Sequence, residues 1–129
     1  MAYWADELRK HYIVYHLAWP VKRVREVLSG KIAKDCTKLI NMKCDERGWT
    51  ILALVVNPDH IYLRVQAWPT TSAYEIVKAC KGLTSHELRM RYAELHKIPS
   101  LWTKAYFAST EERVKSSQIR AYIRGQKKS

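Results

Sequence analysis

The chain has 129 residues, of which 47% are hydrophobic and 27% charged, as expected for a single folded domain spanning residues 1–129 and not for a disordered chain. No apolar run approaches the roughly 20 residues of a membrane span, and the N-terminal MAYWADELRK has no apolar signal core, so a cytoplasmic protein without a membrane partner is predicted. The 23 Lys and Arg residues exceed the 12 acidic residues and give a net charge of +11, which favours a polyanionic partner, nucleic acid above all.

The first half of the chain predicts a strand followed by a helix. HYIVYHLAWP (His11 to Pro20) is rich in aromatic and β-branched residues and stops at a proline, which indicates a strand. The next segment, 22–47, predicts an amphipathic helix, because its apolar residues follow the i, i+4, i+7, i+8 spacing at Ile32, Cys36, Leu39 and Ile40. Gly48 is then expected to end that helix.

A pair of strands is expected next, in WTILALVVNPDHIYLRVQAWP, separated by the turn sequence NPD. The first run, Ile51 to Val56, is almost continuously apolar and is expected to be a central strand. The second alternates, which places side chains on two faces: Ile61, Leu63 and Val65 on one, and His60, Tyr62, Arg64 and Gln66 on the other.

The second half predicts two further helical regions and one strand. SAYE, with Ser72 and Glu75, is a capping-box pattern that starts a helix, and TSHE repeats the pattern at Thr84, so Gly82 is expected to mark a break or bend. LWTKAYFAST is the last strand candidate. SSQIRAYIRGQKK indicates a basic helix, over about residues 112–126.

The cysteines are expected to pack in the core. Cys36, Cys44 and Cys80 are odd in number and show no CxxC spacing. Neither a disulfide framework nor a zinc site is therefore expected, and the thiols should stay reduced.

The order of elements predicts an α+β fold with a ferredoxin-like, RRM-like antiparallel sheet. A βαββαβ order places the helices on one face and leaves the other face available for a ligand. An RNA-binding protein of the RRM kind has no support, because no KGFGFVxF-like aromatic run lies on a strand.

Two features have side chains capable of catalysis. His60 and Tyr62 project the same way on one strand, about 7 Å apart, although a lone strand histidine is usually only solvated and metal ligation needs partners. Tyr122 and Gln126 in IRAYIRGQ share a helix face among cations. A phenol with a pKa near 10 is a poor nucleophile unless cations or a metal assist it, and the alternative for Tyr122 is plain packing.

Taken together, GWTILALVVNPDHIYLRVQAWP, SAYEIVKACKG, LWTKAYFAST and IRAYIRGQ resemble the single-tyrosine HUH transposases of minimal insertion sequences, the IS200-like family. The resemblance covers about residues 11–126, and its pieces stand in the family's order. It implies that His60 is the first histidine of the His-apolar-His metal motif and that Tyr62 occupies the position of the second. It also implies that Tyr122 is the nucleophile and that Gln126 completes the metal site.

The resemblance further implies the reaction. A homodimer with composite active sites would bind imperfect hairpins of single-stranded DNA, and Mg²⁺ or Mn²⁺ would polarise the scissile phosphate. The tyrosine would attack and leave a 5′-phosphotyrosine link and a free 3′-hydroxyl, which can later rejoin DNA. Nicking and strand transfer are thus the implied activity.

Tyr62 departs from the family pattern. A neutral phenol is a weak ligand for a hard divalent ion compared with imidazole or carboxylate. Asp59 is a candidate to supply a carboxylate in its place, although strand alternation points it away from His60 unless the turn twists it. Two interpretations stay open: a transposase with a weakened metal site, or a catalytically impaired relic that binds single-stranded or hairpin nucleic acid.

Basic and aromatic side chains offer a surface for DNA. The arginines and lysines expected to contact phosphates are Lys22, Arg23, Arg25, Arg89, Arg91, Arg120 and Arg124, with Arg113 and Lys115 before the last helix. The five tryptophans and eight tyrosines could stack on unpaired bases. For Trp19, Trp49 and Trp102, core packing is the favoured interpretation.

Overall fold

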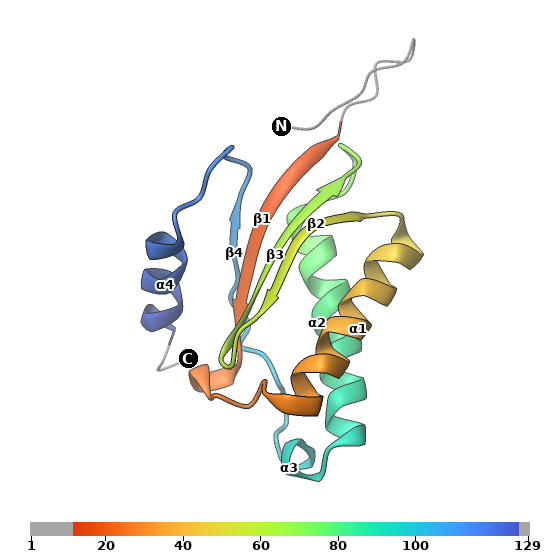
Figure 1. The fold of residues 1–129 in the computed structure, drawn as a ribbon, viewed down its shortest axis with the longest axis vertical. Coiled ribbons are helices and arrows are strands. Elements are labelled where there is room, and N and C mark those ends of the chain that lie inside the picture. The colour runs from red at the N-terminus through yellow and green to blue at the C-terminus, as the bar shows by residue number, and fades with distance from the viewer. Residues whose placement is uncertain (1–11, 127–129) are drawn as a thin grey trace.

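The structure, a computed structural model, describes residues 12–126. It consists of β1 (Ile13–Pro20), the 3₁₀ turn η1 (Lys22–Val24), α1 (Gly30–Arg47), β2 (Thr50–Val56), β3 (His60–Ala67), α2 (Ala73–Arg91), α3 (Ala93–His96), β4 (Phe107–Ser109) and α4 (Ser116–Gly125) (Figure 1). The strands form one antiparallel sheet in the order β2-β3-β1-β4. This is the predicted ferredoxin-like arrangement. No helix within residues 12–126 is both long enough and apolar enough to cross a membrane.

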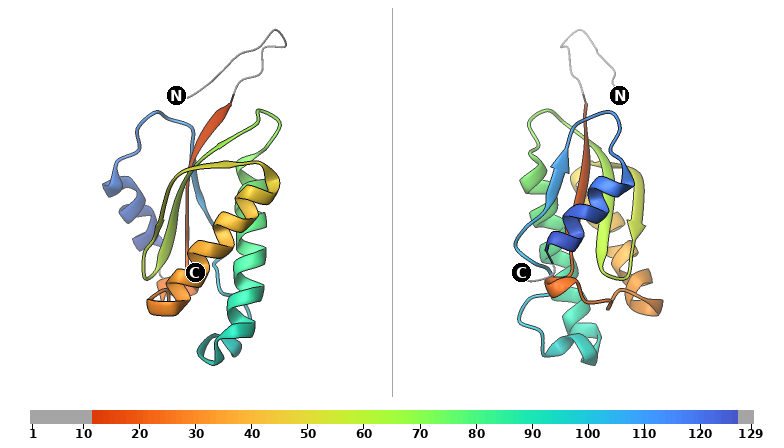
Figure 2. Two further views of the ribbon diagram at one scale, coloured as in Figure 1. Left: turned by 45° about the vertical axis from the view of Figure 1, so that its right-hand side comes forward. Right: turned by 90° about the vertical axis from the view of Figure 1, so that its left-hand side faces the viewer.

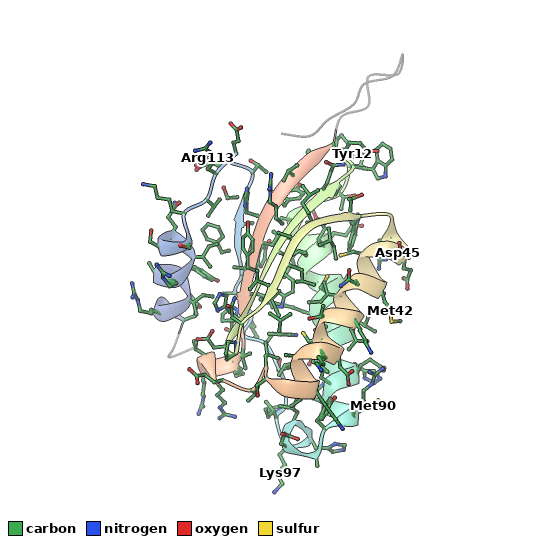
Figure 3. The ribbon with its side chains drawn as sticks, in the orientation of Figure 1. Tyr12, Met42, Asp45, Met90, Lys97 and Arg113 are labelled. Carbon is green, nitrogen blue, oxygen red and sulfur yellow. The ribbon has the colours of Figure 1, made fainter. Side chains whose placement is uncertain are left out.

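The sheet separates two sides of the molecule. Helices α1 and α2 cover one face, and α4 stands on the other side, which we call the open face (Figures 1 and 2). The main core lies under α1 and α2, where Leu17 and Trp19 of β1 and Ile61 and Leu63 of β3 are fully buried. The outer sides of both helices face solvent, as Met42 and Met90 illustrate (Figure 3).

The predicted buried residues behave as expected. Trp19, Trp49 and Trp102 are all buried, so core packing is confirmed for each of them. The three cysteines are buried and free between α1 and α2, at Cys36, Cys44 and Cys80. Burial raises the pKa of the Cys36 thiol to about 12, which keeps that sulfur protonated and unreactive.

The prediction that residues 51–56 form a central strand is wrong. Strand β2 lies at the edge of the sheet, paired only with β3, and Leu52 and Val55 are exposed. The central strands are β1 and β3. A continuous apolar run indicates a strand but does not determine which neighbours pair with it; β3 pairs with β1 along its other edge, and this leaves β2 outside.

The helix predicted within segment 22–47 begins only at Gly30. Residues 21–28 bond to other parts of the chain instead: the Lys22 N–H donates to the Leu101 carbonyl and the Leu28 N–H to the Pro58 carbonyl, each at 2.9 Å. Arg23 and Val24 take left-handed backbone angles, with φ of 60° and 54°, which are rare for non-glycine residues and break any helix. Tertiary hydrogen bonds therefore replace the helical ones here.

The predicted break at Gly82 is also wrong, because α2 runs without interruption from Ala73 to Arg91. Ser72 caps it as expected, accepting a hydrogen bond from the Glu75 N–H at 3.0 Å. Thr84 does not cap a second helix; its hydroxyl donates to the Cys80 carbonyl at 2.7 Å and accepts from the Trp102 indole at 2.9 Å. A helix interior tolerates both residues when such contacts stabilise it.

The last strand is shorter than predicted. Only Phe107–Ser109 of the 101–110 segment pairs with β1, apart from an isolated bridge between Trp102 and Val21. The Lys81 ammonium donates to the carbonyls of Thr103 and Ala105 at 2.8 and 3.0 Å. Because a side chain takes these carbonyls, they are lost to strand pairing.

Two glycines provide a matched test of backbone strain. Gly48 ends α1 with φ of +76°, and Gly82 lies inside α2; an added Cβ would meet open space at both positions. We expect Gly48→Ala to lower the free energy of unfolding by about 1–2 kcal/mol, because an alanine resists the left-handed conformation. Gly82→Ala should raise it by about 0.5–1 kcal/mol. Urea unfolding followed by circular dichroism measures both changes. Equal effects of the two substitutions would contradict a left-handed backbone at Gly48 and a helical one at Gly82.

Candidate active site on the open face of the sheet

The alternation predicted for β3 is confirmed. Ile61, Leu63 and Val65 are fully buried under α1 and α2, and His60, Tyr62, Arg64 and Gln66 are half-buried on the open face. Strand register places Pro20, Ala18, His16 and Val14 of β1 opposite these four side chains, in that order. The open face therefore has polar side chains along β3, flanked by β1.

The turn before β3 holds His60 in one orientation. The His60 Nδ1–H donates to Asp59 Oδ1 at 2.7 Å, and the Asn57 side-chain amide donates to His60 Nε2 at 3.1 Å. This pair of bonds requires the proton on Nδ1, and the Nε2 lone pair accepts the bond from Asn57. The turn thus brings Asp59 to the ring, which strand alternation alone did not predict, and the carboxylate contacts the nitrogen that faces away from Asn57.

The Tyr62 hydroxyl is turned toward a residue that the sequence interpretation missed. It hydrogen-bonds to His16 Nδ1 at 2.7 Å. His16 is opposite Arg64 in β1, so the phenol leans along the sheet away from His60, which is opposite Pro20. Burial, and then the Arg64 charge, lower the pKa of His16, and a neutral ring accepts a hydrogen bond from the Tyr62 O–H through Nδ1. Burial raises the pKa of Tyr62, and Arg64 opposes that shift.

The sequence shows His16 inside a predicted strand, four positions before Pro20 and therefore on the same face of that strand. The missing signal was strand pairing. Only the register between β1 and β3 shows that His16 stands beside Tyr62.

The donor atoms around His60 were compared with what a divalent metal needs. His60 fits in part: its Nδ1–H donates to Asp59, as in many metal-binding histidines, but a metal on Nε2 would have to displace the Asn57 amide, which donates to that nitrogen at 3.1 Å. Tyr62 fits less well, since its hydroxyl is taken by His16. No group of three or more His, Cys, Asp or Glu side chains suited to a metal occurs in the described range, 12–126. His60 is thus one suitable ligand that requires further donors, such as amide oxygens.

Tyr122 lies on α4 against the open face. Ile119 and Ile123 of α4 pack onto Ala18, and Tyr122 joins this small cluster with its ring 5.8 Å from that of Phe107. The Tyr122 hydroxyl is buried and has no hydrogen-bond partner among the described residues. Burial raises the pKa of this phenol. In this position the hydroxyl is shielded and not activated.

A cavity of about 390 Å³ lies between α4 and His60. Its walls include His60 and Tyr62 from β3 and Arg120 from α4, together with Asn57. The remaining lining residues are Val55, Val114, Ser116 and Ile119. Three of the predicted site residues therefore surround one space, which we call the His60 cavity. An anion in it would meet a guanidinium and an imidazole.

The other predicted residues of the last helix lie at its end. Gln126 is the residue after α4, where its backbone N–H donates to the Ile123 carbonyl at 3.0 Å. Arg124 is exposed in the last turn of α4. Tyr122 and Gln126 are thus one helical turn apart, as predicted, although Gln126 has already left helical geometry.

The basic residues do not form one continuous patch. Arg120 and Arg124 lie on α4, whereas Arg89 and Arg91 lie at the end of α2, on the covered side of the sheet. Arg89 donates to the carbonyls of Ile98 and Pro99, and Arg91 pairs with Glu87 at 3.0 Å. Both therefore already have protein partners. The last group, Lys22, Arg23 and Arg25, lies in and just after η1.

Comparison with known proteins shows which protein family the chain is similar to. Residues 9–126 match the family model described as "Transposase IS200 like". The ISDra2 transposase TnpA of Deinococcus radiodurans is 30% identical over 115 residues, which cover 87% of this chain and 82% of that protein. The crystal structure of a proposed transposase from Deinococcus radiodurans R1 has a TM-score of 0.83 and 27% identity, covering 98% of each chain.

A more distant structure shares the fold. A REP-associated tyrosine transposase bound to a REP hairpin has a TM-score of 0.61 at 12% identity, covering 95% of this chain and 66% of that one. The family match over most of the chain, supported by the relative at 30% identity, is decisive. The chain belongs to the family of IS200-like transposases.

Proposed function

We propose that the protein cleaves and rejoins hairpin ends of single-stranded DNA, with Tyr122 as the nucleophile. One observation supports this most directly: in a chain of this family, His60, Tyr62 and Arg120 line a single cavity on the face of the sheet that carries α4. The Arg120 guanidinium in this cavity would attract a phosphate, and the His60 imidazole beside it is a candidate metal ligand. The REP-hairpin complex of the structural neighbour makes a DNA hairpin a reasonable substrate class to test here.

The reaction is phosphoryl transfer without a nucleotide cofactor. The Tyr122 oxygen bonds to the scissile phosphorus while the bond to the 3′ oxygen breaks; the phenol loses its proton and the 3′ oxygen gains one. The products are a 5′-phosphotyrosine link and a free 3′-hydroxyl. Arg120 and Arg124 stabilise the charge on the phosphate oxygens.

The proposed cofactor is Mg²⁺ or Mn²⁺, which His60 Nε2, released from Asn57, and an amide oxygen from Gln126 would hold; such an ion would supply charge that offsets the charge developing on the phosphate. Asp59 orients the His60 ring. Tyr62, at the position of the second histidine, contributes little while its hydroxyl is bonded to His16. We therefore propose a weakened metal site.

Tyr122 must leave its cluster before it can react. A buried hydroxyl without a partner costs about 1–3 kcal/mol, and in this structure the Tyr122 hydroxyl is such a group. This cost favours an alternative position for α4. We propose that the active protein is a homodimer in which the two subunits exchange α4, so that Tyr122 and Arg120 of one subunit together serve the His60 cavity of the other and each active site is composite.

A second function is supported by the Tyr62–His16 bond. Because it removes the phenol from the metal position, the chain could bind hairpin DNA without cutting it, as a catalytically impaired relative. This alternative predicts binding that falls with salt, since phosphate contacts release counterions, and that does not respond to EDTA.

A covalent-trapping assay separates the two functions. The protein is incubated with hairpin-forming single strands from the DNA that flanks its own gene, with Mn²⁺ or with EDTA, and denaturing gels are scored for a protein–DNA adduct. An active transposase gives an adduct with Mn²⁺ and none with EDTA. Hairpin binding that is equal in both conditions, with no adduct in either, would reject cleavage and leave the binding function.

A further inference from the structure

The open face holds buried polar atoms that His60 and Tyr122 do not explain. Arg64 Nε and Gln66 Oε1 are buried without a hydrogen-bond partner in the described part of the chain. His16 is only 4% exposed, and its Nε2 makes no hydrogen bond of normal geometry, although the backbone of Glu111 and Glu112 lies close to the ring. A buried polar atom without a partner lowers stability, because it has lost its hydrogen bonds to water. Their concentration on adjacent positions of β1 and β3 indicates a site for an external polar group.

Two of these side chains, His16 and Arg64, border a hollow in the protein. Two adjoining cavities, of about 290 and 810 Å³, share four lining residues: His16, Arg64, Glu111 and Glu112. The outer wall is the connection between β4 and α4, whose upper end Arg113 marks in Figure 3. We call this space the Arg64 cavity. Its two parts cover the size range of small-molecule sites, roughly 300–1,000 Å³.

The walls combine hydrogen-bond donors with acceptors, and this combination matches the edge of a nucleobase better than a phosphate, which offers acceptors alone. Arg64, Arg113 and Lys115 offer cationic donors, while the exposed residues Glu111 and Glu112 add carboxylate acceptors to the same lining. A carboxylate accepts hydrogen bonds from an exocyclic amine, a donor that a phosphate diester lacks. Guanine matches this combination best, because its O6 and N7 pair with arginine and its N2 amine suits a carboxylate.

The Arg64 cavity adjoins the His60 cavity. Tyr62 and Val114 line both of them. His60, Tyr62 and Arg64 follow each other on one face of β3, about 7 Å apart at each step. A base in the Arg64 cavity would therefore belong to a nucleotide next to the phosphate in the His60 cavity.

We propose that the Arg64 cavity binds an unpaired guanine that flanks the scissile phosphate, with Arg64 on its O6/N7 edge and the Glu111–Glu112 carboxylates on its amine. This rests on the proposed function for the position of the scissile phosphate. It assigns base recognition to the protein surface itself, through side chains that have no role in the transfer of the phosphoryl group.

Binding measured without metal tests the proposal independently of cleavage. The probes are fluorescent hairpins with thymine flanks, in which guanine, adenine or cytosine replaces the thymine at one flank position at a time, in EDTA. At one position, guanine should bind about 5- to 150-fold tighter than the other bases, the discrimination of one bidentate pair. Fluorescence anisotropy gives the dissociation constants. Equal affinity for every base at every position would overturn the proposal.

Variants assign the preference to this cavity. Arg64→Lys keeps the positive charge but removes the two parallel N–H donors that pair with guanine O6 and N7. The guanine preference should therefore disappear, while overall affinity changes little. Glu112→Gln changes an exposed rim residue, does not threaten the fold, and should reduce the preference. Arg47→Lys, at the exposed end of α1, is the matched control and should retain it. A guanine preference that survives both Arg64→Lys and Glu112→Gln would place base recognition elsewhere.

The two proposals fail in different ways. If an adduct through Tyr122 forms equally with any flanking base, the Arg64 cavity does not recognise a base, and the proposed cleavage activity still holds. A guanine preference that depends on Arg64, in a protein that forms no adduct, would reject cleavage and retain base recognition.

Discussion

Tyr122→Phe is expected to abolish the covalent protein–DNA adduct completely, because phenylalanine has no oxygen to attack phosphorus. The fold should not suffer. The Tyr122 hydroxyl is buried without a partner among residues 12–126, so its removal leaves no broken hydrogen bond and should change the free energy of unfolding by less than about 1 kcal/mol, in the stabilising direction if at all. Denaturing gels measure the adduct, and thermal melting measures the stability.

Tyr74→Phe is the matched control, since Tyr74 is an exposed tyrosine on α2, on the covered side of the sheet. This variant should form the adduct normally. If Tyr122→Phe forms the same adduct as the unmodified protein, the nucleophile is another residue.

Mixing two inactive variants tests the composite site. Tyr122→Phe retains His60, and His60→Ala retains Tyr122, so a mixture should regain adduct formation if the tyrosine of one subunit serves the cavity of the other. No recovery from a mixture that demonstrably forms mixed dimers would assign both groups to the same subunit.

Tyr62→His is expected to have the second large effect. The substitution adds an imidazole two positions after His60, on the same face of β3, and releases the bond between the phenol and His16. Because altering even the outer partners of a metal site typically changes affinity 10–100-fold, a direct ligand should raise Mn²⁺ affinity by at least about tenfold. Isothermal titration of the protein with Mn²⁺, without DNA, measures this.

Tyr62→Phe separates the added ligand from the lost hydrogen bond. It also frees His16 but brings no donor atom, so its Mn²⁺ affinity should not rise. Equal Mn²⁺ binding by Tyr62→His and Tyr62→Phe would contradict a metal position at residue 62. A gain in Mn²⁺ affinity together with a gain in adduct formation would show that tyrosine at this position weakens a working enzyme.

The sequence predicted which residues belong to the candidate site, but it did not predict the contacts between them. The resemblance to the IS200-like family identified His60, Tyr62, Tyr122 and Gln126, and the family is confirmed. Their catalytic and metal-binding roles stay predictions. The sequence did not predict that Tyr62 bonds to His16, because that contact joins residues 46 positions apart through the pairing of β1 with β3.

The prediction of DNA-binding residues from the sequence was limited in the same way, because it could not include contacts between distant parts of the chain. Charge alone grouped Arg89 and Arg91 with Arg120 and Arg124. The structure separates them across the sheet, and it gives Arg89 backbone carbonyls and Arg91 a carboxylate as partners. A count of cations cannot distinguish an arginine that holds two segments together from one that is free to meet a phosphate. For this reason the proposed contacts to the scissile phosphate involve only α4.

The sequence by itself determined the order of strands and helices and the two faces of β3, because period-2 alternation and helical spacing are local properties of the chain. It also determined the end of α1 at Gly48, where a left-handed backbone favours glycine. Only the tertiary structure decided that β2 lies at the edge, that α2 continues through Gly82, and that α1 begins late. Those outcomes depend on hydrogen bonds and packing between residues far apart in sequence, such as Lys22 with Leu101 and Thr84 with Trp102, and no local pattern specifies such partners.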